Sequence, residues 1–115
     1  MTAAPFRVVD PTHWVFAGTG LRHDDLFGQR SLHRRCEGGA SGHETDKLSP
    51  FSPPNVQLLA QGTNVNQGGA DMIYYPTSSG GEVFSAGSIT WPACVLVDDA
   101  VSIITANVLR RFLGA

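Results

Sequence analysis

The C-terminal part of the sequence contains one stripe of apolar residues at helical spacing. Its members lie three or four positions apart: Val97, Val101, Ile104, Val108 and Phe112. This spacing places the side chains on one face of an α-helix. A carboxylate at Asp98 or Asp99 suits the first turn, where amide groups lack partners. Arg110 and Arg111 suit the last turn, and Gly114 suits the stop. One helix covers only one face of a sheet, which limits the folds open to this chain.

Short β-rich segments bounded by glycine and proline predict the strands. They are residues 13–17, 56–60, 72–75 and 82–86. The last two are joined by a turn-rich loop, which predicts an antiparallel hairpin. The apolar residues of segment 13–17 are consecutive rather than alternating, as in a strand buried on both faces of an α/β sheet. We therefore expect an α/β fold that packs on a larger domain or another subunit. Residues 1–11 are interpreted as an N-terminal arm, and residues 12–115 as the α/β portion.

Composition excludes several classes of protein. The 115 residues are 42% hydrophobic and 16% charged, with a net charge of -2. A nucleic-acid binder should show a basic excess, which is missing here. The sequence has no apolar run long enough to cross a membrane and no secretory signal, so we expect a cytoplasmic protein. Cys36 and Cys94 are too few for a disulfide framework and are expected to be reduced thiols.

Residues 21–55 have few large apolar side chains and no sustained helical period. So long a segment without regular structure is usually functional or disordered. His33, Cys36 and His43 lie within it and offer metal-ligand chemistry. Arg34 and Arg35 lie inside this cluster and would repel a cation, and a fourth ligand is not evident. We therefore favour surface or loop-bracing roles over a metal site.

Two other short patterns do not complete a known motif. Gly18-Thr19-Gly20 follows a predicted strand, but the third glycine of a dinucleotide-binding loop is missing. Neither Ser41 nor Ser88 lies in the G-x-S-x-G pattern of a nucleophile elbow. The sequence thus disfavours both nucleotide binding and serine hydrolysis.

The run from residue 38 to residue 47 has the most informative chemistry. It contains three glycines, which would let the backbone approach a ligand closely, followed by His43, Glu44, Asp46 and Lys47. Charged groups on a glycine-rich loop suit a general acid or base. The alternative is a solvated loop in which Glu44 and Lys47 form a weak surface pair. The spacing by itself leaves both interpretations open.

Five strings of the sequence carry a family resemblance. In chain order they are HWVFAGTGLRHDDLFG, SLHRRCEGGASGHETDK, SPPNVQLLAQGTN, GGADMIYYPTSSGGEVFSAGSITWP and VDDAVSIITANVLRRFL. Together they resemble the C-terminal region of the large (beta) subunit of N,N-dimethylformamidase and its relatives. The resemblance implies hydrolysis of a small N-substituted amide to a carboxylate and an amine. It also implies a flavodoxin-like or class I glutamine-amidotransferase-like layer, and an iron site held by tyrosines and a glutamate.

The same resemblance implies a separate catalytic glutamate, for which Glu44 in GHETDK is the natural match, with His43 beside it. The iron ligands of the family are expected upstream of the matched region, so Tyr74 and Tyr75 are interpreted as sheet residues. The implied mechanism is a metal-polarised amide carbonyl, water as nucleophile and Glu44 as general base. Neither Cys36 nor Cys94 stands in an amidotransferase-like elbow, so we do not expect a cysteine nucleophile.

We therefore expect the C-terminal portion of an amide hydrolase, inactive alone, without an evident metal of its own. Its expected partners are the upstream remainder of the enzyme or a partner subunit, and a second copy through self-association. The alternative is a non-catalytic domain of the same fold, kept for packing, oligomerisation or small-molecule binding, with a structural Glu44. An open pocket around residues 38–46 would favour the enzyme, whereas a Glu44 buried against Lys47 or an arginine with no cleft nearby would favour the alternative.

Overall fold

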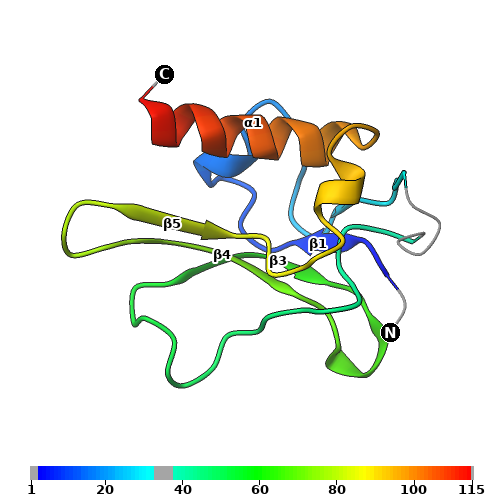
Figure 1. Ribbon diagram of the computed structural model, residues 1–115, viewed down its shortest axis with the longest axis horizontal. Coiled ribbons are helices and arrows are strands. Elements are labelled where there is room, and N and C mark those ends of the chain that lie inside the picture. Colours follow the sequence, from blue (N-terminus) through cyan, green and yellow to red (C-terminus); the bar gives the residue numbers. More distant parts are fainter. Residues whose placement is uncertain (1–2, 33–37, 115) are drawn as a thin grey trace.

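The computed structural model describes residues 3–32 and 38–114. Its main element is a five-stranded sheet in the order β2-β1-β3-β4-β5, in which every neighbouring pair is antiparallel (Figure 1). The strands are β1 (Phe6–Val8), β2 (Leu26–Phe27), β3 (Gln57–Gly62), β4 (Asp71–Pro76) and β5 (Glu82–Ser85). The expected α/β class is confirmed. The flavodoxin-like or amidotransferase-like layering is not, because such a layer is built on parallel strands.

The single long helix, α1 (Asp99–Leu113), forms as the sequence predicts. The Asp98 side chain accepts a hydrogen bond from the Val101 amide at its start, and Gly114 closes it at φ 72. Val101, Ile104 and Val108 are buried, so the centre of the predicted stripe faces the core. Its two ends differ from the prediction. Val97 precedes the cap residue and is half-buried, and Phe112 in the last turn is 46% exposed.

The predicted hairpin is also confirmed. Strands β4 and β5 pair antiparallel, with Tyr74 opposite Phe84. The loop between them is closed by hydrogen bonds between Thr77 and Gly81. The pairing of β3 with β4 adds a third strand, so residues 57–85 form a continuous meander.

The prediction of a strand at residues 13–17 is wrong. Residues Trp14–Phe16 form a short 3-10 helix, η1, whose first amides are capped by the His13 side chain. Asn107 of α1 donates hydrogen bonds to the carbonyls of Val15 and Ala17 at 2.9 Å each. A consecutive apolar run suits either a buried strand or a short turn packed between two layers, and here η1 packs against α1.

The segment interpreted as an N-terminal arm contains β1, which lies between β2 and β3. Phe6 and Val8 are completely buried, whereas Arg7 between them is exposed. Two prolines made this segment too short to be predicted as a strand, yet its alternation is that of a half-buried strand. The arm interpretation is therefore corrected for residues 6–8.

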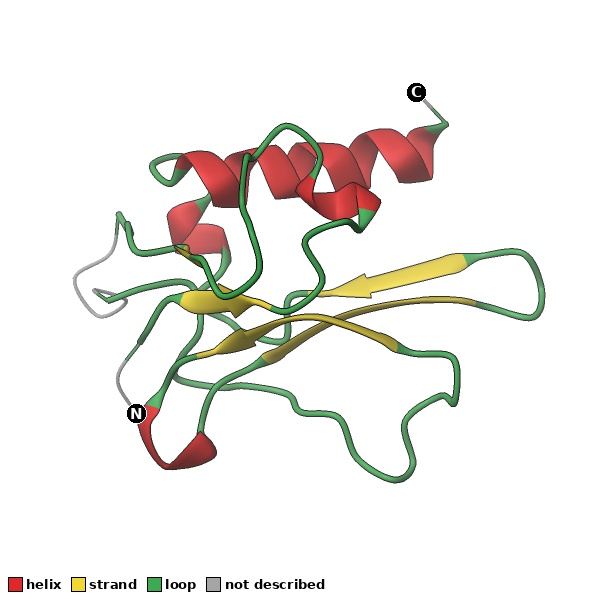
Figure 2. Ribbon diagram, turned by 180° about the vertical axis from the view of Figure 1, so that it is seen from behind, coloured by secondary structure: helices red, strands yellow, loops and turns green. Residues whose placement is uncertain are grey.

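The core lies between the sheet and α1. Phe6 and Phe27 stack with ring centroids 5.5 Å apart, and Trp91 and Phe16 meet this pair edge-on. On the opposite side of the sheet, the described residues contribute no α-helix but only the short 3-10 helix η3 (Val65–Gln67), and the connection that leads into β3 runs along it (Figures 1 and 2). The expectation that the one long helix covers one face is thus met. No helix among the described residues is long and apolar enough to span a bilayer.

Candidate active site

The segment around Glu44 is held in place by the stretch that follows β5. The Ile89 amide donates to the Glu44 carbonyl at 3.2 Å, and the Asp46 amide donates to the Gly87 carbonyl at 2.8 Å. These bonds form around an isolated antiparallel bridge. The backbone is paired on both sides of residue 45. The main chain at Glu44 is therefore held in place, although it lies outside the main sheet.

His43 is the centre of a tight turn. The Glu44 amide donates to the Gly42 carbonyl at 2.8 Å, and His43 between them has φ 62. A three-residue turn with a positive φ is rare and strained for a residue with a side chain. The turn leaves the His43 and Glu44 side chains exposed on adjacent positions.

Glu44 lines an open cleft of about 590 Å³. Asp46 provides a second carboxylate on the same wall, while Phe84, Ile89 and Trp91 provide apolar surface. Within the described part of the chain Glu44 forms no ion pair, so the surface pair with Lys47 is not seen. Of the segment 38–46, in which an open pocket was expected to favour the enzyme, residues 44–46 line this cleft.

A carboxylate at an open cleft with apolar walls can accept a proton from water while a small molecule rests on the wall. His43 is adjacent to Glu44 in the chain, but it is not among the residues that the structure places on the cleft lining. The structure therefore places Glu44 on the same cleft as Asp46, Phe84 and Trp91. Neither aromatic could be assigned to this cleft from the sequence, because the bridge between residues 45 and 88 joins segments far apart in the chain.

The glycines before Glu44 let the N-terminal segment of the chain, and not a ligand, approach their backbone closely. A Cβ atom on Gly39 would lie 2.4 Å from the Ala4 carbonyl, and one on Gly42 would lie 2.6 Å from the Ala3 Cα. Ala4 pairs with Ser41 in an isolated antiparallel bridge at this point. The expectation that these glycines serve close approach to a ligand is corrected, since the N-terminal segment fills that space.

The other candidate nucleophiles and ligands that the structure describes are engaged in contacts within the protein. His33 and Cys36 lie outside the described residues. Among the residues that are described, no three His, Cys, Asp or Glu side chains gather as a metal site. Cys94 is buried and its thiol donates to the Thr90 carbonyl. The buried Ser41 hydroxyl contacts the Asn64 amide group and accepts from the Ala70 amide, so its role is structural.

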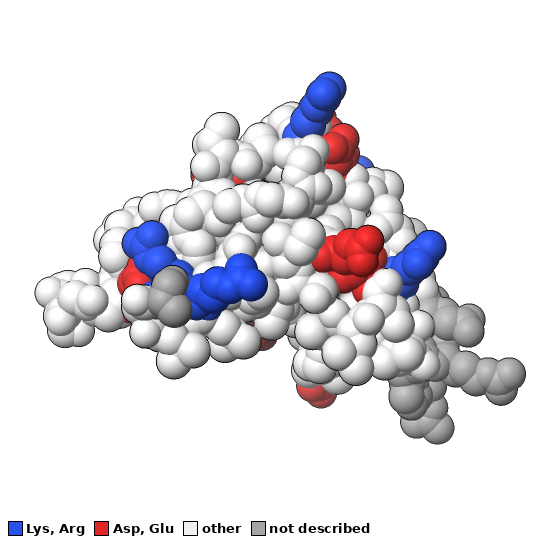
Figure 3. All heavy atoms as spheres, turned by 90° about the horizontal axis from the view of Figure 1, so that it is seen from above, with Lys and Arg blue, Asp and Glu red and all other residues white. Residues whose placement is uncertain are grey.

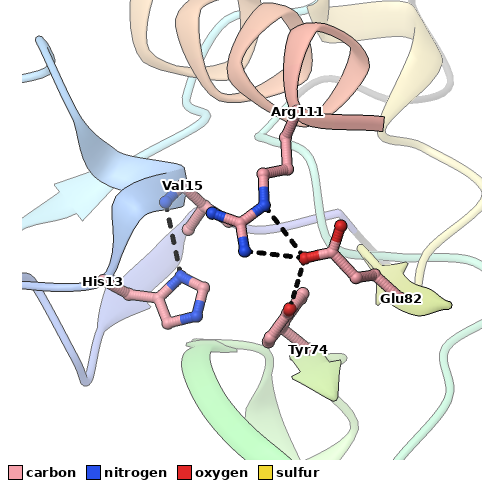
Figure 4. A network of polar contacts seen from close by, with 5 residues as sticks. All are labelled: His13, Val15, Tyr74, Glu82 and Arg111. Carbon is pink, nitrogen blue, oxygen red and sulfur yellow. Dashed lines mark hydrogen bonds and ion pairs between the residues drawn. The ribbon is translucent and has the colours of Figure 1, made fainter. Parts of the chain in front are cut away.

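A second polar cluster joins α1 to the β4–β5 hairpin (Figure 4). One oxygen of Glu82 accepts from the Tyr74 hydroxyl at 2.5 Å and from Arg111 Nε at 2.9 Å. Burial raises the pKa of Tyr74, and the hydrogen bond to Glu82 raises it further. The hydrogen bonds from Tyr74 and Arg111 lower the pKa of Glu82. The polar groups of the cluster bond to one another, which is typical of a contact that stabilises the fold.

Two aromatic residues complete the surroundings of this cluster. The Arg111 guanidinium lies 4.8 Å from the centre of the Trp14 ring, and the His13 ring centroid lies 5.0 Å from that of Tyr74. Burial lowers the pKa of His13, whose Nδ1 accepts a hydrogen bond from the Val15 amide. The sequence did not predict this cluster, because Arg111 was interpreted only as a cation suited to the last turn of the helix.

The whole chain can now be compared with known proteins. A family model described as N,N-dimethylformamidase beta subunit-like, C-terminal, matches residues 1–100. The chain belongs to this family. Two relatives are the N,N-dimethylformamidase beta subunits of Paracoccus aminophilus and of an Alcaligenes species, each 32% identical over 128 aligned residues. The match covers 87% of this chain but 16% of each relative, so the chain spans about one-sixth of their length.

The resemblance to the N,N-dimethylformamidase beta subunit is thus confirmed. The residues matched to the family model include the whole sheet and the Glu44 cleft. Most of α1, from Val101 onward, lies beyond the last matched residue. The candidate site therefore lies within the part of the chain that the family model matches.

Proposed function

We propose that this chain is the C-terminal portion of a dimethylformamidase-type amide hydrolase, with Glu44 as its general base. The observation that carries the proposal is the exposed Glu44 carboxylate on a cleft whose lining also includes the apolar Phe84, Ile89 and Trp91, in a chain that belongs to this family. The substrate class is a small N-substituted amide, which becomes a carboxylate and an amine.

The chemistry assigned to this chain is proton transfer. Glu44 accepts a proton from the water that attacks the amide carbonyl, and it can return that proton to the leaving nitrogen. Phe84 and Trp91 offer the apolar surface on which N-alkyl groups rest. Asp46 lies in the same cleft and is the competing candidate for the base. His43 supports Glu44 from the adjacent position.

The iron implied by the resemblance does not fit the described residues of this chain. Tyr74 and Tyr75 are successive residues of β4 and so point to opposite faces of the sheet. The Tyr74 hydroxyl is already bonded to Glu82, and the described residues contain no cluster of three His, Cys, Asp or Glu ligands. We therefore assign the iron to the remainder of the enzyme and route no step through it. The isolated chain should accordingly be inactive.

The test is a chimera in which these 115 residues replace the matching segment of the Paracoccus aminophilus beta subunit. The chimera should hydrolyse N,N-dimethylformamide, whereas the isolated chain and the truncated subunit should not. A chimera that folds and loads iron but is inactive would contradict the catalytic role. Hydrolysis by the isolated chain would contradict the need for a partner.

The alternative, a packing or oligomerisation domain, is favoured by a different surface. Leu109, Phe112 and Leu113 of α1 are 56%, 46% and 80% exposed. Figure 3 looks onto α1 and shows a largely uncharged surface between acidic and basic side chains at its ends. Exposed apolar patches favour association. Sedimentation velocity at several concentrations should show self-association that Leu109→Lys weakens, and a concentration-independent monomer would contradict this alternative.

A further inference from the structure

A second cavity, of about 310 Å³, lies beside β1 and β3 and is separate from the Glu44 cleft. Every side chain on its lining is polar, and none is acidic; the lining residues are Arg7, Lys47, Gln61, Gly62, Thr63, Asn64 and Gln67. Two cations and three amide side chains surround this small space; Gln61 and Asn64 each also donate to a protein acceptor, Asp71 and the Ser41 carbonyl. Such a lining favours an anion.

The cations reach the cavity from two different elements. Arg7 on β1 is directly opposite Gln61 on β3, and its exposed side chain alternates with the buried Phe6 and Val8. Arg7 and Gln61 therefore share the sheet face that points away from α1. Lys47 comes from the segment that leads away from Glu44. Neither cation forms an ion pair with any residue in the described ranges.

The loop that closes the cavity is fixed in an unusual conformation. Gln67 lines the cavity with φ 57, in the left-handed region that few residues other than glycine adopt. The Thr63 hydroxyl and amide both donate to the Pro5 carbonyl, at 2.8 Å and 2.9 Å. The Thr45 hydroxyl donates to the Gly68 carbonyl at 2.8 Å. Both ends of the loop are thus anchored, and strain at an anchored loop often marks a binding site.

The local charge indicates which anion fits. Asp71 is buried, and its two oxygens accept from Gln61 Nε2 at 3.3 Å and from the Leu48 amide at 2.8 Å. Asp71 is opposite Gln61, which is opposite Arg7, so this carboxylate adds a negative charge next to the cavity and fixes the Gln61 amide. A negative charge so close to the cavity disfavours a doubly charged phosphate more than a singly charged carboxylate. The planar guanidinium of Arg7 also matches the two oxygens of a carboxylate.

We propose that this cavity is a binding site for a small carboxylate, with Arg7 and Lys47 as its charged ligands and Gln61 and Gln67 as amide donors. The site does not depend on the proposed hydrolysis, since it uses different residues on a different cavity.

The test is an NMR titration of the ¹⁵N-labelled 115-residue chain with sodium acetate, in which sodium chloride is withdrawn to hold ionic strength constant. The amide signals of Gln61, Thr63 and Gln67 should shift and saturate. Arg7→Gln and Lys47→Gln should each weaken acetate binding by roughly tenfold. Arg110→Gln, which removes an exposed cation from α1, should keep the parental affinity.

Two further measurements make the outcome decisive. Inorganic phosphate at pH 7.5 should bind more weakly than acetate, and tighter binding of phosphate would overturn the assignment to carboxylates. Shifts that do not saturate, or an equal loss in Arg110→Gln, would show that no site exists. Both Arg7→Gln and Lys47→Gln alter exposed side chains, and the dispersion of their spectra checks that each variant is folded.

Discussion

Arg111 donates to a single oxygen of Glu82 through both Nε and a terminal nitrogen, each 2.9 Å from Oε1. The same oxygen accepts from the Tyr74 hydroxyl, so three donors converge on it. Arg111 belongs to the last turns of α1 and Glu82 begins β5, so this relationship ties the helix to the hairpin (Figure 4).

The hydrogen bonds accepted by Glu82 predict a loss of stability in acid. The donors hold the pKa of Glu82 below its ordinary value of 4.5 in the folded state. A group with a lowered folded pKa stabilises the fold fully above its unfolded pKa and loses that contribution as the pH falls through the folded pKa. The free energy of unfolding should therefore decrease below about pH 4.5, and less steeply in Glu82→Gln. Urea denaturation between pH 3 and pH 7 measures this. Equal slopes in the parent and Glu82→Gln would contradict it.

His13 predicts a second pH dependence, at a higher pH. Burial lowers the pKa of His13 below 6.5, although the nearby Asp10 and a hydrogen bond with Gln57 offset part of the effect. Because the folded pKa is lowered, the stabilising contribution is complete above pH 6.5 and is lost as the pH falls toward the folded pKa. Protonation would also remove the Nδ1 acceptor used by the Val15 amide.

The matched variant is His13→Asn, which keeps an acceptor at the start of η1 but does not titrate. Its free energy of unfolding should change less between pH 5 and pH 7 than that of the parent. An NMR titration gives the pKa directly. A measured His13 pKa of 6.5 or higher would show that the ring is not desolvated in the fold.

The buried stripe of α1 predicts a strong contrast between two residues of the same helix. Ile104 is completely buried, whereas Leu109 is 56% exposed. Ile104→Asp should abolish soluble folding, because burying an unpaired carboxylate costs several kcal/mol and a small domain is stable by about 5–15 kcal/mol. Leu109→Asp should fold like the parent. Circular dichroism and thermal melting test both variants. An Ile104→Asp protein that melts like the parent would show that this stripe of α1 is not part of the core.

The elements predicted from the sequence are those whose signals are local. The period of the α1 stripe, the Asp98 cap and Gly114 identify the helix, and the turn between β4 and β5 identifies the hairpin. Strands β1 and β2 have only 3 and 2 residues, too few for a period to be visible. Their existence depends on pairing with distant β3, which local sequence does not reveal.

The candidate site was predictable only in part. Glu44 was identified by its family resemblance and by the chemistry of its neighbours. The apolar part of the lining could not be predicted, because the bridge between Thr45 and Ser88 places Phe84 and Trp91 on the same cleft as Glu44. The contact between Tyr74 and Glu82 is a diagonal pair of the hairpin, and it would follow from the sequence once the register is known.

His43 and Asp46 distinguish the possible roles around Glu44 in the active chimera. His43→Ala should cost less activity than loss of Glu44 if His43 only orients Glu44 or the substrate, and as much if it relays the proton. Asp46→Asn removes the neighbouring carboxylate of the same cleft and should also cost less than loss of Glu44. Steady-state hydrolysis of N,N-dimethylformamide by the three variants provides the ranking. A larger loss in Asp46→Asn would transfer the role of base to Asp46.

The most direct measurement is kcat for Glu44→Gln in that chimera, together with its iron content. Glutamine keeps the size of the side chain and removes its ability to accept a proton, and general-base help is worth about 10²–10⁴-fold in rate. The account predicts that kcat falls by that factor while iron content stays at the level of the parent chimera. Full retention of amide hydrolysis would place the base elsewhere, and loss of iron would make Glu44 a metal ligand, so either result would contradict the account.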